Sequence, residues 1–264
     1  MDAQLHFSQI AWRSEIGLQR EGNEDSGFVS RQLIAVADGM GGYIGGEIAS
    51  SAVITKLSEL TKILESPELD QDSREDLLRE SVIDMDAAIS EICADRPELI
   101  GMGTTLTSIS LFLNQVLLLH IGDSRAYRIR GKRIERLSHD HTVVQELVDQ
   151  GRLSLDEIAE HPQRSFLTQA LMGKQNLTPI LFAYPAELGD VFLVCSDGLT
   201  AVVDEGSIIR ALQSCNSQQE LEDAVNSLIE LTYNNGAPDN VTVIAAVIGT
   251  AKSDLSPTKF GAAK

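Results

Sequence analysis

Short apolar runs and longer helical repeats occupy separate blocks of the chain. Continuous apolar runs, or alternations rich in β-branched residues, predict strands at 33–38, 104–113, 116–122, 126–130, 133–137, 191–195 and 241–248. Apolar residues spaced three and four apart predict helices within 48–64, 77–92 and 218–233. Because the helices and strands do not alternate, the sequence predicts an α+β layered sandwich and not a doubly wound parallel fold.

Very short links join consecutive predicted strands at 114–115, 122–124 and 131–132. A parallel crossover needs a dozen or more residues, so we expect these links to join antiparallel neighbours in a meander. The polar block 141–173 interrupts the strand series and is interpreted as a flap over one end of the sheet. Residues 251–264 lack periodicity and are expected to form a disordered tail.

The composition is typical of a soluble globular chain, since no apolar run approaches the roughly 20 residues that span a bilayer. The first residues lack the features of a secretory signal, so a cytoplasmic location is expected. A formal net charge of −18 disfavours partners such as nucleic acid or an anionic membrane. The widely spaced Cys93, Cys195 and Cys215 fit neither a disulfide framework nor a zinc site. Cys195, within VFLVC, is interpreted as a buried core thiol, which disfavours thiol catalysis.

Four aspartates share one kind of position, at the boundary between an apolar strand and a polar or glycine-containing turn: Asp38, Asp123, Asp197 and Asp239. Each could be an ordinary turn residue. If the strand ends converge, however, the carboxylates repel one another unless a cation lies among them. Ligation by oxygen alone suits magnesium, manganese or calcium better than zinc or copper.

Arg20 lies five residues before Asp25 in GLQREGNEDSGF and offers a planar guanidinium that can hold two phosphate oxygens. His120, at the end of VLLLH, is interpreted as structural. The triplet at 139–141, His-Asp-His, has only a superficial likeness to a metal site.

Two other enzyme classes can be compared with these patterns. LIAVADGMGGYIGGEIAS runs from strand through glycine-rich turn to helix, but it lacks the full dinucleotide-binding spacing and precedes antiparallel strands. Asp84 and Asp86, in VIDMDAA, could suggest a haloacid-type phosphatase, but helical periodicity surrounds them. We interpret that pair as part of a solvated helix face.

In order and spacing, the chain from about residue 14 to residue 248 resembles the metal-dependent protein phosphatase family (PPM, or protein phosphatase 2C type), in its short bacterial form. The motifs that carry the resemblance are REGNEDSGF, VADGMGGYIGGEIAS, GMGTTLTSISL, HIGDSRAYRIR, SHDHTVVQELVDQG, HPQRSFLTQALMG, FLVCSDGLT and PDNVTV. The resemblance implies a four-layer α-β-β-α sandwich of two antiparallel sheets flanked by helices, in one phosphatase domain over residues 1–250.

The resemblance also implies a role for matching residues. Asp38 and Asp239 would bind two catalytic cations, Mn²⁺ or Mg²⁺, and Asp197 would bind one of them. Gly39 would contribute its carbonyl oxygen, and Asp123 would help Asp197 to bind a weaker third cation.

The remaining implied roles concern phosphate and water. Arg20 would hold the phosphate, while Glu24 and Asp25 would accept hydrogen bonds from metal-bound waters. The two cations would lower the pKa of a bridging water from about 15.7 towards neutrality, so that hydroxide attacks phosphoserine or phosphothreonine without a covalent intermediate.

The implied partners are phosphorylated proteins and a cognate Ser/Thr protein kinase, and the implied state is a monomer. The alternative is a catalytically silent member of the fold that binds phosphoproteins.

The sequence departs from the family at Tyr43, where many bacterial members have histidine. An unperturbed tyrosine, with a pKa of about 10, donates a proton less readily near neutral pH. Tyr43, His161 from the flap, or metal-bound water are therefore alternative proton donors. Two other residues differ from those usual in the family. Glu15 stands where an aspartate usually precedes the glycine, and Gln169 stands where a flap arginine is found.

Overall fold

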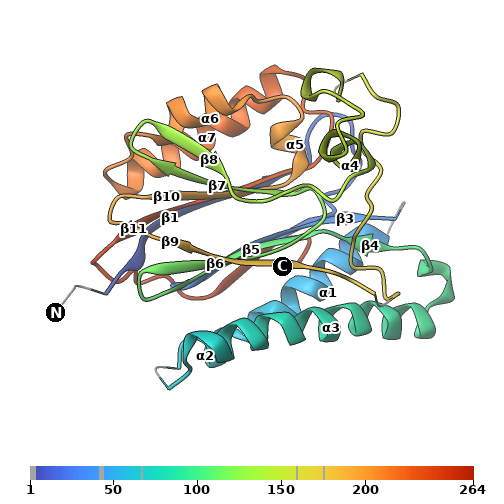
Figure 1. The fold of residues 1–264 in the computed structure, drawn as a ribbon, viewed down its shortest axis with the longest axis horizontal. Coiled ribbons are helices and arrows are strands. Elements are labelled where there is room, and N and C mark those ends of the chain that lie inside the picture. Colours follow the sequence, from blue (N-terminus) through green and yellow to red (C-terminus); the bar gives the residue numbers. More distant parts are fainter. Residues whose placement is uncertain (1–3, 42–44, 67, 159, 175) are drawn as a thin grey trace.

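Two antiparallel sheets pack face to face, with helices on both outer sides (Figure 1). The computed structural model describes residues 4–264 except 42–44, 67, 159 and 175. The five-stranded sheet has the order β1-β11-β10-β7-β8 and contains β1 (His6–Glu15), β7 (Arg125–Arg130), β8 (Arg133–Arg136), β10 (Val191–Cys195) and β11 (Val241–Gly249). The seven-stranded sheet has the order β12-β2-β3-β5-β6-β9, with β4 beside β3; its strands are β2 (Asp25–Val29), β3 (Leu33–Met40), β4 (Gly103–Thr104), β5 (Leu106–Phe112), β6 (Gln115–Ile121), β9 (Ile180–Pro185) and β12 (Thr258–Gly261).

Each sheet has its own helical layer. The seven-stranded sheet is covered by α1 (Gly45–Glu59), α2 (Thr61–Leu64) and α3 (Gln71–Asp95), with η1 (Pro97–Leu99) after them. The five-stranded sheet is covered by α5 (Asp197–Thr200), α6 (Glu205–Leu212) and α7 (Gln218–Asn234). The flap contains α4 (Val143–Asp149) and η2 (Leu155–Glu157). The predicted four-layer α+β architecture is confirmed. Among the described helices, none has the length and apolar character needed to cross a membrane.

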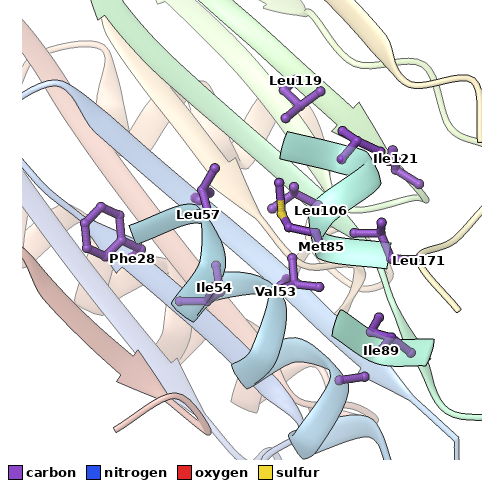
Figure 2. Packing of buried hydrophobic residues seen from close by; sticks show 14 of the residues in the cluster. Phe28, Val53, Ile54, Leu57, Met85, Ile89, Leu106, Leu119, Ile121 and Leu171 are labelled. Carbon is purple, nitrogen blue, oxygen red and sulfur yellow. The ribbon is translucent and has the colours of Figure 1, made fainter. Parts of the chain in front are cut away.

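Alternate residues of the central strands face different layers, which explains the continuous apolar runs in the sequence. In β11, Val243 and Ala245 pack beneath α6 and α7, whereas Ile244 and Ala246 face the other sheet. On the other side of the sandwich, Val53, Ile54 and Leu57 of α1 pack with residues of α3 and the seven-stranded sheet (Figure 2). Burial on both faces fixes the register of these strands, since a shift by one residue would exchange the two faces.

The link at 122–124 does not form a hairpin. It carries the chain from β6 in one sheet to β7 in the other, so the prediction that it joins antiparallel neighbours is wrong. Gly122 makes this crossing possible, because its φ is 106° and an added Cβ would lie 2.5 Å from Thr105 Cγ2. The links at 114–115 and 131–132 do form hairpins, as predicted. The crossing places Asp123 at the open end of the sandwich, between the two sheets.

The prediction of a disordered tail over 251–264 is also wrong. Strand β12 pairs with β2 from Thr258 opposite Val29 to Gly261 opposite Ser26, and it extends the seven-stranded sheet. Phe260 is buried and packs among residues that lie between the sheets. Four residues are too few to give a clear period, so only the three-dimensional contact reveals this strand.

Candidate active site

Two carboxylates face each other across neighbouring strands of one sheet. Asp25 of β2 pairs in register with Asp38 of β3, and strand alternation directs both side chains towards the other sheet. Asp25 is fully buried, and Ser196, at the end of β10 in the opposite sheet, donates to its Oδ2 at 2.7 Å. Asp25 Oδ1 has no hydrogen-bond partner among the described residues. A buried carboxylate oxygen without a donor is costly, so this atom fits a place beside bound water or a cation.

Three further aspartates reach the same end of the sandwich from the surrounding elements. Asp123 lies at the crossing between the sheets, Asp197 is the first residue of α5, and Asp239 directly precedes Asn240 and β11. Asp38 and Asp197 lie close enough to interact, and each influences the pKa of the other. The chain thus gathers five aspartates that lie far apart in its sequence.

Burial and mutual repulsion disfavour ionisation of these carboxyl groups. Burial raises the pKa of Asp38 well above its usual range, and the carboxylates of Asp25 and Asp197 raise it further. Burial raises the pKa of Asp25 to about 7, although hydrogen bonds from Ser196 and Thr242 lower it. Burial and then Asp197 raise the pKa of Asp123 well above its usual range. A cation among these groups would reverse the effect and favour their ionised forms.

Arg20 is paired with one of the candidate metal ligands. Its Nη2 lies 2.6 Å from Asp239 Oδ2, while the backbone N–H of Asn240 donates to Asp239 Oδ1 at 2.8 Å. As the side chains stand, no three His, Cys, Asp or Glu residues in the described part of the chain are grouped around a common ion position. Since Arg20 engages Asp239, a cation would have to displace that ion pair to reach this carboxylate.

Gly39 and Glu24 lie against the start of α1. A Cβ at Gly39 would overlap the carbonyl of Gly46, and a Cβ at Gly46 would lie 2.6 Å from Glu24 Oε2. The backbone N–H of Glu24 donates to Asn240 Oδ1 at 2.8 Å, so the residue directly before β11 also holds this segment. Glycine is required at both positions because the backbone of β3, the start of α1 and the acidic segment approach so closely.

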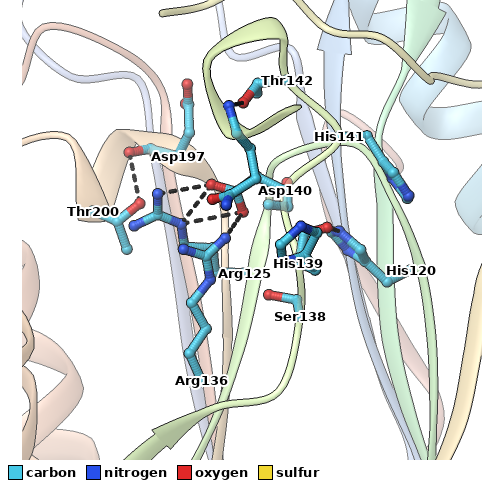
Figure 3. A network of polar contacts seen from close by, with 12 residues as sticks. His120, Arg125, Arg136, Ser138, His139, Asp140, His141, Thr142, Asp197 and Thr200 are labelled. Atoms are coloured by element: carbon cyan, nitrogen blue, oxygen red, sulfur yellow. Dashed lines mark hydrogen bonds and ion pairs between the residues drawn. The ribbon is translucent and has the colours of Figure 1, made fainter. Parts of the chain in front are cut away.

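An ion-pair network joins Asp140, the residue directly before the flap, to the five-stranded sheet (Figure 3). Arg125 donates to Asp140 Oδ2 through Nη2 at 2.7 Å, and Arg136 forms a second ion pair with the same carboxylate. A cavity of about 520 Å³ lies between this network, the flap residue Arg164 and the carboxylates of Asp123 and Asp197. Flap residues and two carboxylates of the acidic cluster therefore line the same cavity.

The histidines around this network have structural partners. His120 is buried between the hydroxyl of Thr107 and the carbonyl of His139, each 2.9 Å from a ring nitrogen, which confirms its predicted structural role. Burial lowers the pKa of His120 to about 3. His139 Nε2 lies 2.7 Å from Asp149 Oδ2, and His141 Nδ1 accepts from the N–H of Gly122 at 3.1 Å. The triplet therefore fixes the base of the flap.

Comparison with known proteins identifies the family and the fold. The family model described as protein phosphatase 2C matches residues 23–239. The chain belongs to the protein phosphatase 2C family. It is 42% identical over 241 residues to the serine/threonine protein phosphatase PstP of Mycobacterium tuberculosis, a match that covers 90% of this chain and 44% of PstP. The chain thus spans less than half the length of that relative.

One further relative and one solved structure extend the comparison of this phosphatase 2C chain. The serine/threonine phosphatase stp of Listeria welshimeri is 32% identical over 242 residues, covering 88% of this chain and 93% of stp. The catalytic domain of PstP in complex with two manganese ions superposes with a TM-score of 0.83 at 39% identity, covering 92% of this chain and 99% of that structure. The protein phosphatase 2C family is metal-dependent, and this relative holds two manganese ions.

Of the two side chains predicted as proton donors for this phosphatase 2C chain, the structure describes only His161. Tyr43 lies outside the described residues. His161 lies in the flap, where its Nδ1 accepts from the N–H of Gln163 at 3.2 Å. That contact remains within the flap, so the proton donor stays a sequence-based hypothesis.

Hydroxyl side chains that the sequence did not single out support the strand that carries Asp38 in this phosphatase 2C domain. The carbonyl of Asp38 accepts from the N–H of Thr105 and from the hydroxyl of Thr104, both at 2.9 Å. Thr105 Oγ1 in turn accepts from the N–H of Asp38 at 3.0 Å and lies 2.8 Å from Ser124 Oγ. The adjacent threonines of GMGTTL are the feature of the sequence from which this support for Asp38 could have been predicted.

The prediction for Asp86 is wrong. Its side chain is buried and not on a solvated helix face, and Oδ1 accepts from the N–H groups of Met172 and Gly173 at 2.9 and 2.7 Å. Asp84, by contrast, is exposed. The difference arises because the end of the flap, distant in sequence, covers one side of α3. Asp86 therefore anchors the flap of this phosphatase 2C domain.

Cys195 has the structural role expected of it. It is buried on the face of β10 that packs beneath α6 and α7, away from Asp25. Burial raises the pKa of its thiol to about 12, which disfavours the nucleophilic thiolate.

Proposed function

We propose that this chain is a protein serine/threonine phosphatase that hydrolyses phosphoserine and phosphothreonine monoesters. The observation that carries the proposal is the convergence of five aspartates at one end of the sandwich with Arg20 beside them. Membership of the protein phosphatase 2C family, and the names of the PstP and stp relatives, support the same reaction class. Substrates are proposed to be phosphorylated proteins, and the catalytic domain is proposed to extend beyond residue 250 and to include β12.

The acidic cluster fits a site for two hard divalent cations, Mn²⁺ or Mg²⁺. The unpartnered Oδ1 of Asp25 and the mutual effect of the carboxylates on their pKa values support this assignment. Asp38, Asp197 and Asp239, with the carbonyl of Gly39, would hold the two ions. Asp123 together with Asp197 would hold a third cation, which is bound more weakly. When bound, such ions supply a hydroxide nucleophile near neutral pH and offset charge on the phosphate.

Side chains of the protein are proposed to bind the phosphate, orient the water and donate the proton. Arg20, exposed on the rim, binds the phosphate oxygens after it leaves Asp239. Asp25 and Glu24 accept hydrogen bonds from water in the site and orient it for attack on phosphorus. The departing seryl or threonyl oxygen needs one proton, which Tyr43, His161 or water supplies. In this proposal the nucleophile is hydroxide and not the thiol of Cys195, which faces the other layer.

Hydrolysis of para-nitrophenyl phosphate and of a phosphothreonine peptide tests the proposal directly. We expect turnover with Mn²⁺ that disappears on chelation and returns when the ion is restored. Folded protein that binds a phosphopeptide but releases no phosphate with Mn²⁺ or Mg²⁺ would instead support the silent, phosphoprotein-binding alternative. All four sequence-derived metal aspartates are present in the cluster, which favours the enzyme.

The wider setting of the enzyme is proposed from the same resemblance. We place it in the cytoplasm as a monomer that opposes a cognate Ser/Thr protein kinase. Size-exclusion chromatography with light scattering tests the monomer, and phosphoproteomics after deletion tests the substrates. Phosphoproteins whose signal rises on deletion, and that the purified enzyme dephosphorylates, are the expected substrates.

A further inference from the structure

The C-terminal strand ends directly beside the buried carboxylate of the acidic cluster. β12 pairs with β2 at the edge of the seven-stranded sheet, and the N–H of Ala262 donates to the carbonyl oxygen of Asp25 at 2.8 Å. Ala263, the next residue, is buried in the layer formed with α1 and α3. This segment lies beyond residue 239, where the match to the family model ends.

Two glycines, Gly27 and Gly261, allow β12 to pack closely against β2. A Cβ at Gly27 of β2 would overlap the ring of Phe260, so the ring occupies the space that a side chain would fill. The same ring lies 5.9 Å from the ring of Trp12 in β1, between centroids. Gly261 has a φ of 74°, and a Cβ there would overlap the carbonyl oxygen of Asp25. The strand thus contacts both the backbone of Asp25 and the opposite sheet.

Hydrogen bonds from three separate segments hold the side chain and the backbone of Asp25. Its Oδ2 is held by Ser196 of the other sheet, its N–H donates to Asn23 Oδ1 at 3.0 Å, and its carbonyl is held by Ala262. Without β12, β2 would become the free edge of its sheet and lose the last of these contacts. Asp25 and Asp38 are register partners, so movement of β2 would alter the spacing of both carboxylates.

We infer that strand β12 is a positioning element of the metal centre, which sets the affinity for divalent cations by fixing the backbone of Asp25. The inference rests on the proposed two-metal function. Residues outside a metal's direct ligands commonly change its affinity when removed, by roughly tenfold to a hundredfold. Phe260, Gly261 and Ala262 act through Asp25 and touch no substrate.

Three variants test the inference by calorimetric titration with Mn²⁺. The first is Phe260→Ala, the second is Gly261→Ala, and the third is a chain that ends at Pro257. We expect each to bind Mn²⁺ roughly tenfold or more weakly. Turnover of para-nitrophenyl phosphate at saturating Mn²⁺ should fall by a smaller factor than the affinity for Mn²⁺ does.

Lys259→Gln is the matched control within the same strand. Its side chain is exposed, and its Nζ lies 3.3 Å from Thr55 Oγ1, away from Asp25. This variant should bind Mn²⁺ as the unaltered protein does. Phe260→Leu should recover part of the affinity lost in Phe260→Ala, because leucine refills some of the space above Gly27.

A purely structural strand would give a different result. The melting temperature of Phe260→Ala and Gly261→Ala would fall while their Mn²⁺ affinity stayed unchanged, and that outcome would overturn the inference. If the shortened chain does not fold, the two point variants decide the question. Failure of the unaltered protein to bind Mn²⁺ would instead count against the proposed function itself.

Discussion

Arg20 Nη2 lies 2.6 Å from Asp239 Oδ2, so the candidate phosphate-binding residue rests on a candidate metal ligand. The side chains are 46% and 32% exposed, and an ion pair this open is worth only about 0–1 kcal/mol. Binding of a cation and a phosphate can therefore separate the two residues at little cost. Arg20 and Asp239 should then contribute to different steps.

Replacement of Arg20 should separate phosphate binding from metal binding. We expect Arg20→Ala to lower kcat/KM by about a hundredfold or more, because donors to phosphate oxygens are lost. Mn²⁺ affinity, measured by calorimetry, should be equal or slightly higher, since Asp239 loses a competing partner. Arg20→Lys should recover only part of the activity because ammonium cannot bind two oxygens side by side. Weaker Mn²⁺ binding in Arg20→Ala would contradict this division of roles.

Asp239→Asn should act on the metal itself. The amide keeps the size of the side chain but loses its charge, so we expect almost no turnover at low Mn²⁺ and partial recovery at high Mn²⁺. Asp254→Asn, an exposed change of equal charge, is the control. Near-normal turnover of Asp239→Asn at limiting Mn²⁺ would remove Asp239 from the site.

The raised pKa values predict how stability depends on pH. Asp25 has a pKa of about 7 in the folded chain and 3.8 when unperturbed, so between these values the folded state binds more protons than the unfolded state. The free energy of unfolding should then fall as pH rises from about 4 to about 7. Asp38 and Asp123 act in the same direction. Thermal melts in chelator should therefore show a higher melting temperature at pH 5 than at pH 8.

Mn²⁺ should remove the fall in melting temperature with rising pH, because the ion binds the ionised carboxylates and its affinity rises with pH. Asp25→Asn should flatten the pH dependence in chelator, since one titrating group is lost. A melting temperature that rises steadily from pH 5 to pH 8 in chelator would show that the cluster does not resist ionisation.

Much of the site could be predicted because its aspartates adjoin strands that are buried on both faces. The apolar runs before Asp38 and Asp197 mark β3 and β10, and the run after Asp239 marks β11. Strand β2 gives no such pattern, since its buried residues include Asp25 and Ser26. Their partners, Ser196 and Ser50, come from distant parts of the chain. A local pattern cannot contain that information.

Asp86→Ala should loosen the end of the flap. The change leaves the N–H groups of Met172 and Gly173 without their acceptor, and Leu171 beside them pairs with Thr104, which supports Asp38. We expect a loss of about 1–3 kcal/mol in the free energy of unfolding. The fall in kcat/KM should be larger for a phosphoprotein than for para-nitrophenyl phosphate, because the larger substrate has more surface that can contact the flap. The exposed neighbour Asp84→Ala is the control, and equal losses for both substrates would argue against a role for the flap.

Cys195→Ala tests whether the thiol takes part in the chemistry. The side chain packs under α6 and α7, and its thiol has a pKa raised to about 12, so neither position nor charge suits a nucleophile. We expect Mn²⁺-dependent kcat/KM to be unchanged and the free energy of unfolding in urea to fall by about 1 kcal/mol, as the core loses one buried sulfur. Cys215→Ala, at a half-buried position, should cost less stability. A folded Cys195→Ala protein without turnover would transfer the nucleophile from hydroxide to the thiol and overturn the two-metal proposal.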